Sequence, residues 1–189
     1  MADEERRYWD HRYRTYGRLA TAPAPFVVEA VARYAPLPGR AIDVAGGTGR
    51  HAVWLALRGW DVTLIDVSAA AIERARRDAV GAGVSLTTRC EDLDEATLPP
   101  GPWNLVVVHH YLNRALFPEI PGVLAPGGLL VFAQPTVENL RRNDRPGPDH
   151  SLDAGEAATL VSGFHVISIF EGWTVYGLHE AQVIARRPD

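Results

Sequence analysis

Five short apolar runs recur along the middle of the chain, and helical patterns separate them. The runs are AIDVA from Ala41, DVTLID from Asp61, VSLTT from Val84, WNLVVV from Trp103 and GLLVFA from Gly128. Most of their positions are apolar, as expected for strands that helices cover on both faces. The alternation predicts a parallel sheet wrapped by helices, because parallel neighbours need helical crossovers.

The last part of the chain has a different pattern. Residues 135–150 are polar and rich in proline, which predicts a long loop, and such loops in compact domains are usually functional. Two further strand-like runs, HVISIF and HEAQVIARR, have a short connection, which predicts an antiparallel pair at the sheet edge. The predicted fold is therefore a Rossmann-like, doubly wound α/β sheet of seven strands, five parallel and two antiparallel.

Composition argues against several partners and locations for this chain. With 23 acidic and 19 basic residues the formal net charge is -4, so nucleic acid is not expected as a partner. The chain starts with charged residues and has no long apolar stretch, so neither a secretion signal nor membrane association is expected. Cys90 stands alone, which fits a cytoplasmic protein without disulfides or a cysteine-based metal site.

The stretch AIDVAGGTGRHAVWLA predicts a strand, a glycine turn and a helix. Gly46, Gly47 and Gly49 let the backbone approach a ligand closely, and the following helix begins with free N–H groups. These features predict a cradle for an adenosyl compound. The same glycines also fit the looser dinucleotide-binding pattern, and a bare structural turn is the third interpretation.

Carboxylates follow the next two predicted strands. Asp66 ends the second run about 20 residues beyond the glycines, where a carboxylate can accept both ribose hydroxyls of a nucleoside. Alternatively, Asp66 only favours the start of the next helix. Asp92 follows the third run, where with Leu93 it could hold an adenine ring, or where it could simply belong to a solvated acidic turn with Glu91.

The segment from Asp43 to Gly49 resembles the first motif of class I S-adenosylmethionine-dependent methyltransferases. Asp66, Asp92 and the turn at residues 124–128 fall where that family carries its further motifs, so the resemblance covers residues 38–134. It implies that Asp43 helps to fix the glycine loop and the methionine amino group. Two departures are Ala45, where the commonest motif has its first glycine, and Asn104, where such proteins often have aspartate.

The opening of the chain adds a closer likeness. Residues 8–13, YWDHRY, resemble the aromatic opening of small-molecule methyltransferases related to tellurite-resistance and thiopurine enzymes. The resemblance implies a segment that folds over the cofactor. Because this segment combines large aromatics with arginines, we predict that it is mobile without the cofactor and ordered with it. The alternative is a helix that packs on the core through Tyr8, Trp9 and Tyr13. The cofactor-binding residues expected overall are Tyr8, Trp9, Arg12, Asp43, Ala45, Gly46, Gly47, Gly49, Asp66, Val67, Glu91, Asp92, Leu93 and His109.

His109, His110 and Tyr111 end the fourth predicted strand, at the edge that faces the transferable methyl group in this fold. Strand alternation sends His109 and Tyr111 to one side and His110 to the other. Any of the three could touch the acceptor or take its proton as a catalytic group. Alternatively, they only order the strand end. No carboxylate is obviously placed to orient either histidine, so their replacement is expected to have a mild effect.

Together these observations predict a single domain, with an N-terminal lid and helix at 1–37, a cofactor-binding core at 38–134, and a substrate loop with closing strands at 135–189. We expect S-adenosylmethionine-dependent methyl transfer to a small-molecule acceptor, by a monomer or homodimer and without a metal. The alternatives are an S-adenosylmethionine-binding regulator without turnover and, less favoured, an NAD(P)-dependent oxidoreductase.

Overall fold

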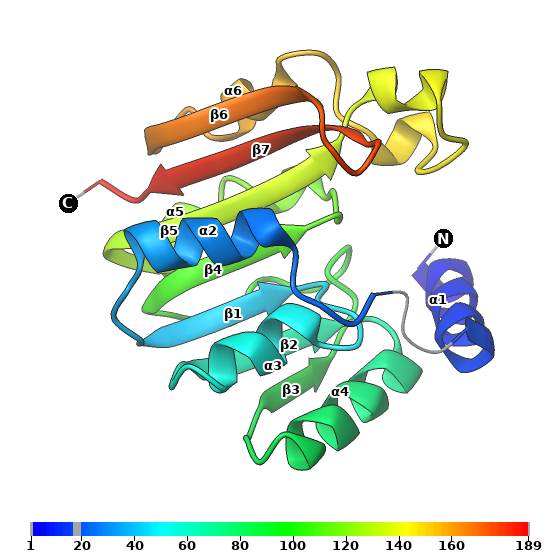
Figure 1. Ribbon diagram of the computed structural model, residues 1–189, viewed down its shortest axis with the longest axis vertical. Coiled ribbons are helices and arrows are strands. Elements are labelled where there is room, and N and C mark those ends of the chain that lie inside the picture. The colour runs from blue at the N-terminus through cyan, green and yellow to red at the C-terminus, as the bar shows by residue number, and fades with distance from the viewer. Residues whose placement is uncertain (1, 17–19, 189) are drawn as a thin grey trace.

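The computed structural model of the chain describes residues 2–16 and 20–188 (Figure 1). Residues 17–19, which belong to the predicted lid, lie outside the described residues. The strands are β1 (Arg40–Val44), β2 (Asp61–Asp66), β3 (Thr87–Cys90), β4 (Trp103–His109), β5 (Leu124–Pro135), β6 (His165–Trp173) and β7 (His179–Arg186). The α-helices are α1 (Ala2–Tyr16), α2 (Pro25–Tyr34), α3 (Arg50–Ala56), α4 (Ala69–Gly81), α5 (Ile120–Val123) and α6 (Glu156–Leu160). The 3₁₀ helices are η1 (Arg114–Leu116), η2 (Val137–Arg141) and η3 (Pro148–His150).

The sheet has the predicted topology. Its seven strands follow the order β3-β2-β1-β4-β5-β7-β6. Neighbours from β3 to β5 pair in parallel, whereas β7 is antiparallel to both β5 and β6. The predicted doubly wound fold with an antiparallel C-terminal pair is therefore confirmed. The order reverses at β1, whose carboxyl end and that of β4 border a crevice where ligands bind in such sheets.

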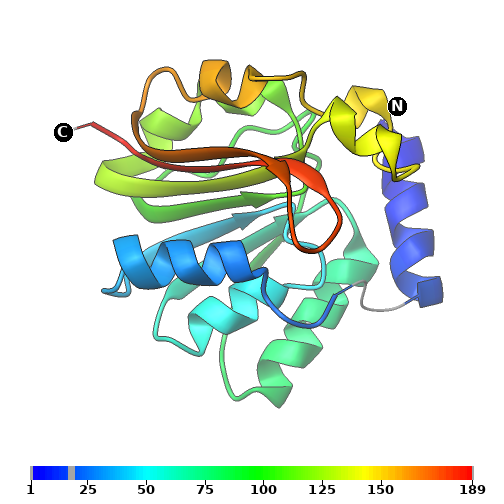
Figure 2. The same ribbon diagram turned by 45° about the horizontal axis from the view of Figure 1, so that its top comes forward.

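Helices cover both faces of the sheet (Figure 2). α2, α3 and α4 lie over one face, where they bury Ala41, Leu105 and Val107. η1, α5 and α6 lie over the other face, where Ile42 and Val106 belong to a second core. Consecutive residues of β1 and β4 thus enter different cores, which is why these strands are apolar at nearly every position.

The segment predicted as a long loop, residues 135–150, contains the two 3₁₀ helices η2 and η3. Asn139 organises it from a fully buried position: its Oδ1 accepts from the backbone N–H of His179 at 3.1 Å. Its Nδ2 donates to the carbonyl of Arg145 at 2.9 Å. Short 3₁₀ helices leave no long periodic pattern, so the sequence did not reveal them. No helix within residues 2–16 and 20–188 has the length and apolar character to cross a bilayer.

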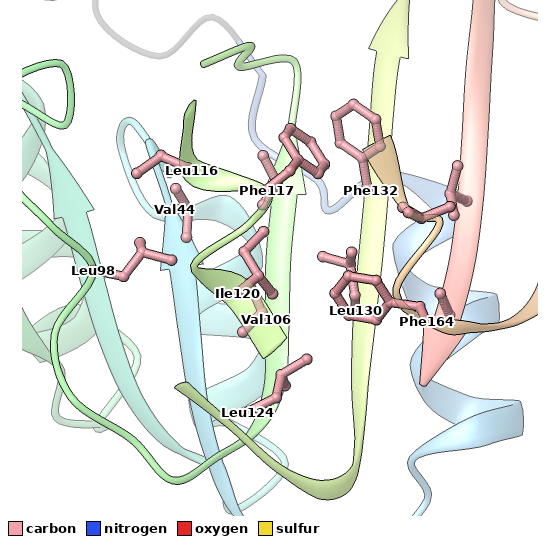
Figure 3. Packing of buried hydrophobic residues seen from close by; sticks show 14 of the residues in the cluster. Val44, Leu98, Val106, Leu116, Phe117, Ile120, Leu124, Leu130, Phe132 and Phe164 are labelled. Atoms are coloured by element: carbon pink, nitrogen blue, oxygen red, sulfur yellow. The ribbon is translucent and has the colours of Figure 1, made fainter. Parts of the chain in front are cut away.

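The packing of the second core predicts a large cost for removing one ring. Phe132 is fully buried, and its ring meets that of Phe117 edge to face with centroids 4.8 Å apart (Figure 3). We expect Phe132→Ala to lower the free energy of unfolding by about 3–5 kcal/mol, measured by urea denaturation, because it leaves a cavity. Phe170→Ala is the matched control, because Phe170 is 45% exposed on the edge strand β6. Equal losses in both variants would contradict the assignment of the core.

Candidate functional site

The glycine loop joins β1 to α3 at the carboxyl edge of the sheet. At Gly46 a Cβ atom would lie 2.5 Å from Oδ2 of Asp43, and at Gly47 it would lie 2.5 Å from Oη of Tyr13. Gly47 also has φ +57°. Neither position has room for a side chain, because Gly46 faces Asp43 beneath the loop and Gly47 faces Tyr13 of α1.

Ala45 stands where the related motif has its first glycine, and it keeps a glycine-like backbone with φ 51°. For an L-residue this left-handed conformation costs about 1–2 kcal/mol. The alanine therefore keeps the backbone conformation that a glycine would have at this position, at a cost in backbone strain. Strained residues of this kind gather at functional sites.

Asp66 ties the loop to the end of β2. Its Oδ2 accepts from the N–H of Gly47 at 2.8 Å, and its Oδ1 accepts from the N–H of Ser68 at 2.9 Å. Burial raises the pKa of Asp66 to about 6, against the lowering effect of these two hydrogen bonds. The cap of α4 is Ser68, whose Oγ accepts from the N–H of Ala71, so Asp66 does more than start that helix.

Asp43 lies beneath the loop with 1% of its surface exposed. Its Oδ2 accepts from the N–H of Ala52 at 3.1 Å, which fixes the start of α3. Its Oδ1 is buried and has no hydrogen-bond partner among the described residues; Nδ1 of His51 is 3.8 Å away. Asp43 therefore ties β1 to the start of α3, and one of its oxygens lacks a donor among the described residues.

Helix α1 lies across the carboxyl edge of the sheet, beside α4 and the η2–η3 segment (Figures 1 and 2). Oδ1 of Asp10 accepts from Oγ of Ser68 at 2.6 Å and from the N–H of Ala70 at 3.1 Å. Burial raises the pKa of Tyr13, helped by the nearby charge of Asp66. Sequence reasoning missed Asp10 and Tyr13 as site residues, although they are one turn apart on the helix that it placed over the site.

The other predicted residues of α1 lie near the η2–η3 segment. Oη of Tyr8 accepts from Nη1 of Arg145 at 2.7 Å and from Nη1 of Arg12 at 3.3 Å. Trp9 stacks on Tyr13 with ring centroids 5.8 Å apart. Nε of Arg12 is buried without a hydrogen-bond partner among the described residues. α1 thus contacts the η2–η3 segment through Tyr8 and Arg145, while Tyr8 itself is 41% exposed and packs on neither hydrophobic core of the described residues.

His109 ends β4 beside α3. Its Nδ1 accepts a hydrogen bond from Nη2 of Arg50 at 3.1 Å, since a guanidinium can only donate. Burial, with the neighbouring His110, His51 and Arg50, holds the pKa of His109 well below its ordinary value. His109 is therefore neutral at pH 7 and carries its hydrogen on Nε2. Arg50 was not predicted as a site residue.

His110 lies next to a buried carboxylate that sequence reasoning missed. Its Nε2 is 2.8 Å from Oε2 of Glu180, which is 6% exposed on β7. Burial pushes the pKa of Glu180 upward, but hydrogen bonds from His110 and Gln182 outweigh it and hold that pKa below its ordinary value. The expectation that no carboxylate orients either histidine is wrong, because β7 pairs with β5 and brings Glu180 to this edge.

Tyr111 does not share a side with His109. Its Oη donates to Oδ1 of Asp94 at 3.3 Å, and its ring packs against the second core. The predicted alternation fails because β4 ends at His109 and His110 has φ 60°, which turns the chain. The tyrosine is therefore held by the loop after β3, whereas the rings of His109 and His110 remain adjacent, with centroids 4.0 Å apart.

The acidic turn after β3 is largely occupied with its own contacts. Glu91 accepts from Nε of Arg89 at 2.8 Å, and Oδ1 of Asp92 accepts from the N–H of Asp94 at 3.0 Å. Leu93 is buried in the second core. Separately, Asn104 accepts from the backbone N–H of Arg40, and the carbonyl of Val67 accepts from Sγ of Cys90.

Comparison with known proteins supports a family. Residues 41–128 match the family described as a methyltransferase domain. The tRNA 5-carboxymethoxyuridine methyltransferase of Escherichia coli (strain K12) is 34% identical over 108 residues, covering 53% of this chain and 41% of that protein. The ribosomal RNA small subunit methyltransferase C of Alcanivorax borkumensis is 29% identical over 126 residues, covering 61% of this chain and 38% of that protein.

The sequence match and the fold together support the predicted class I methyltransferase. Among solved structures, TehB from Haemophilus influenzae matches with a TM-score of 0.75 and 17% identity, covering 97% of this chain and 67% of that one. This likeness shows that this chain and TehB share a fold. The matched part of this chain spans about two fifths of the length of the two curated relatives.

The expectation that nucleic acid is no partner is contradicted by these relatives, which are named for methylating tRNA and ribosomal RNA. Net charge was a poor criterion because it averages the whole surface, whereas polyanion binding depends on where basic side chains gather. Here the hydroxyl of Tyr8 accepts from both Arg12 of α1 and Arg145 of the η2–η3 segment, which brings these two arginines together.

Proposed function

We propose that this protein binds S-adenosylmethionine across the glycine loop and transfers its methyl group to an acceptor at the carboxyl end of β4. The observation that carries the proposal is the convergence of the glycine loop with two buried carboxylates, Asp43 and Asp66, inside the segment that matches the family. Bound S-adenosylmethionine supplies an activated methyl group on a sulfonium. The residues described here bind and align it and exclude water.

Two buried atoms without partners fit the amino-acid end of that cofactor. Oδ1 of Asp43 lacks a donor and Nε of Arg12 lacks an acceptor, counting the described residues only. The charges of Asp43 and Arg12 both act on the pKa of the Tyr13 hydroxyl, so both groups lie in its neighbourhood. Unpaired buried polar atoms are costly, and an ammonium and a carboxylate, directly or through water, are the partners that these two lack.

Asp66 fits the ribose end. Each of its oxygens already accepts one backbone N–H, and a carboxylate oxygen has room for a second hydrogen bond. Two ribose hydroxyls would therefore complete its hydrogen bonding. They would also favour the charged form that burial opposes.

For the acceptor, we propose a small molecule. The contact of Tyr8 with Arg145 holds α1 against the η2–η3 segment over the carboxyl edge of the sheet. A small acceptor reaches a site covered in this way more easily than a macromolecule does. RNA is a second candidate, favoured by the names of the curated relatives and by the arginines that flank the entrance. An RNA substrate would have to insert one unstacked nucleotide beneath α1.

The acceptor is tested by release of S-adenosylhomocysteine with two substrate sets, total tRNA and a library of small hydroxyl, amine and thiol compounds. We expect turnover with the small-molecule set that ribonuclease treatment leaves unchanged. Turnover that depends on intact RNA would replace the small-molecule proposal with the RNA one. Binding of S-adenosylmethionine without turnover on either set would favour the regulator that the sequence left open.

Replacing Asp66 is expected to weaken cofactor binding. Asp66→Ala should cost about 1.5–3 kcal/mol of S-adenosylmethionine affinity by calorimetry, the scale of hydrogen bonds to a charged acceptor. Wild-type affinity should also fall as the pH drops through about 6, because protonation of Asp66 removes acceptor capacity, whereas Asp66→Ala should lack this dependence. Asp61→Ala is the control, since Asp61 is an exposed carboxylate on the same strand. Unchanged affinity in folded Asp66→Ala would contradict the site.

The position of α1 predicts a change in its protection. Because Oη of Tyr13 lies against Gly47, α1 has to open to admit the cofactor and can then close over it. Backbone amides of residues 6–16 should exchange more slowly with S-adenosylhomocysteine than without it. The amides of α2 serve as the internal reference. Equal protection of α1 in both states would leave it as ordinary packing.

A further inference from the structure

The ring of His110 is fixed by three features of the fold. Its backbone has φ 60°, and its N–H donates to the carbonyl of Ala133 on β5 at 2.8 Å. Its Nε2 meets Oε2 of Glu180 at 2.8 Å, and the other oxygen of Glu180 accepts from Nε2 of Gln182 at 2.7 Å. A strained backbone and a buried carboxylate, supplied by different strands, thus set one ring orientation.

We propose that Glu180 is a positioning residue that orients His110 as a general base, and that the acceptor therefore carries a proton, on a hydroxyl or amine, which Nδ1 of His110 removes. This inference rests on the proposed methyl transfer. It reverses the mild role that the sequence suggested for the histidines, and it favours protic acceptors over anions such as thiolates.

The tautomer follows from the partner of each nitrogen. An ionised carboxylate can only accept, so the hydrogen of the neutral ring lies on Nε2, between His110 and Glu180. Nδ1 then bears the lone pair. No described residue donates to Nδ1, and the side chain of His110 is one third exposed, so this atom can be reached by an acceptor. A carboxylate that holds a histidine in one tautomer is the arrangement found in established acid–base catalysis.

The neighbouring His109 is unsuited to the same task. Its Nδ1 lone pair is occupied by Nη2 of Arg50, and its Nε2 carries the hydrogen. The groups facing His110 are therefore Glu180 from β7 and neutral His109 from β4, with Arg50 of α3 behind His109. Arg50 also acts on Glu180, where its charge favours the carboxylate form. Two adjacent histidines thus have opposite environments, which separates a donor from a base.

The proton transfer balances without any further reactant. The acceptor oxygen or nitrogen gives an electron pair to the methyl carbon, and the carbon–sulfur bond breaks with its pair left on sulfur. The proton of the acceptor moves to Nδ1 of His110. The resulting imidazolium is stabilised by Glu180 and later loses this proton to water.

The first test reads the tautomer directly. We expect ¹⁵N NMR of the neutral wild-type ring of His110 to show hydrogen on Nε2 only. Glu180→Gln should admit the Nδ1-protonated form, whereas Glu171→Gln should not, because Glu171 is an exposed carboxylate on the neighbouring strand β6. A wild-type ring with hydrogen on Nδ1, or identical spectra in wild type and Glu180→Gln, would overturn the proposal.

The second test uses single-turnover methyl transfer to the acceptor identified in the screen. His110→Ala should lower the rate by about 10²–10⁴-fold. Glu180→Gln should lower the rate by about 10–100-fold and move the acid limb of the pH profile to lower pH, because the imidazolium loses its carboxylate. Glu180→Asp should recover part of the rate.

Calorimetry with S-adenosylhomocysteine separates this proposal from the proposed function. Unchanged affinity in Glu180→Gln, as in Glu171→Gln, shows that the variant is folded and that the lost rate belongs to the proton transfer. A wild-type protein that binds neither S-adenosylmethionine nor S-adenosylhomocysteine would contradict the proposed function itself. Normal binding and turnover with wild-type rates in His110→Ala and Glu180→Gln, or methylation of thiolates only, would overturn the general-base proposal alone.

Discussion

The buried carboxylate of Asp66 connects the separate parts of this site. It accepts hydrogen bonds from Gly47 in the glycine loop and from Ser68 at the start of α4. Ser68 in turn donates to Asp10, which anchors α1 over the edge of the sheet. Loop, strand, helix and cover therefore share one chain of hydrogen bonds. Protonation of Asp66 would weaken the hydrogen bonds along this chain, and burial raises the pKa of Asp66 to about 6.

Buried polar atoms without partners and strained backbone concentrate at this edge of the sheet. Asp43 and Arg12 each have an unpaired atom near the hydroxyl of Tyr13, and Ala45 and His110 are the non-glycine residues with positive φ in the described chain. Each feature costs free energy in the protein alone. Their common location is understandable if a zwitterionic ligand completes the hydrogen bonds, because binding then recovers part of that cost.

The family match covers residues 41–128, which hold the glycine loop, Asp66 and the histidines but not α1 or β7. The proposed cofactor site and the strand end of His109 thus belong to the part matched by the family. The cover in α1 and the carboxylate of Glu180 come from outside it. Acceptor choice is expected to depend on these outer parts, as it does in folds that support different reactions through their variable segments.

The sequence by itself determined the sheet, its parallel core and antiparallel pair, and the position of the glycine loop with Asp43 and Asp66. These features are local: apolar runs, helix caps and glycine turns are written in neighbouring residues. Only the tertiary structure decided which side chains meet across strands. Glu180 lies 70 residues after His110 in the chain, and it reaches His110 because β7 pairs beside β5. Tyr111 leaves His109 because a positive φ at His110 breaks the alternation, and no periodic pattern in one sequence encodes such a turn.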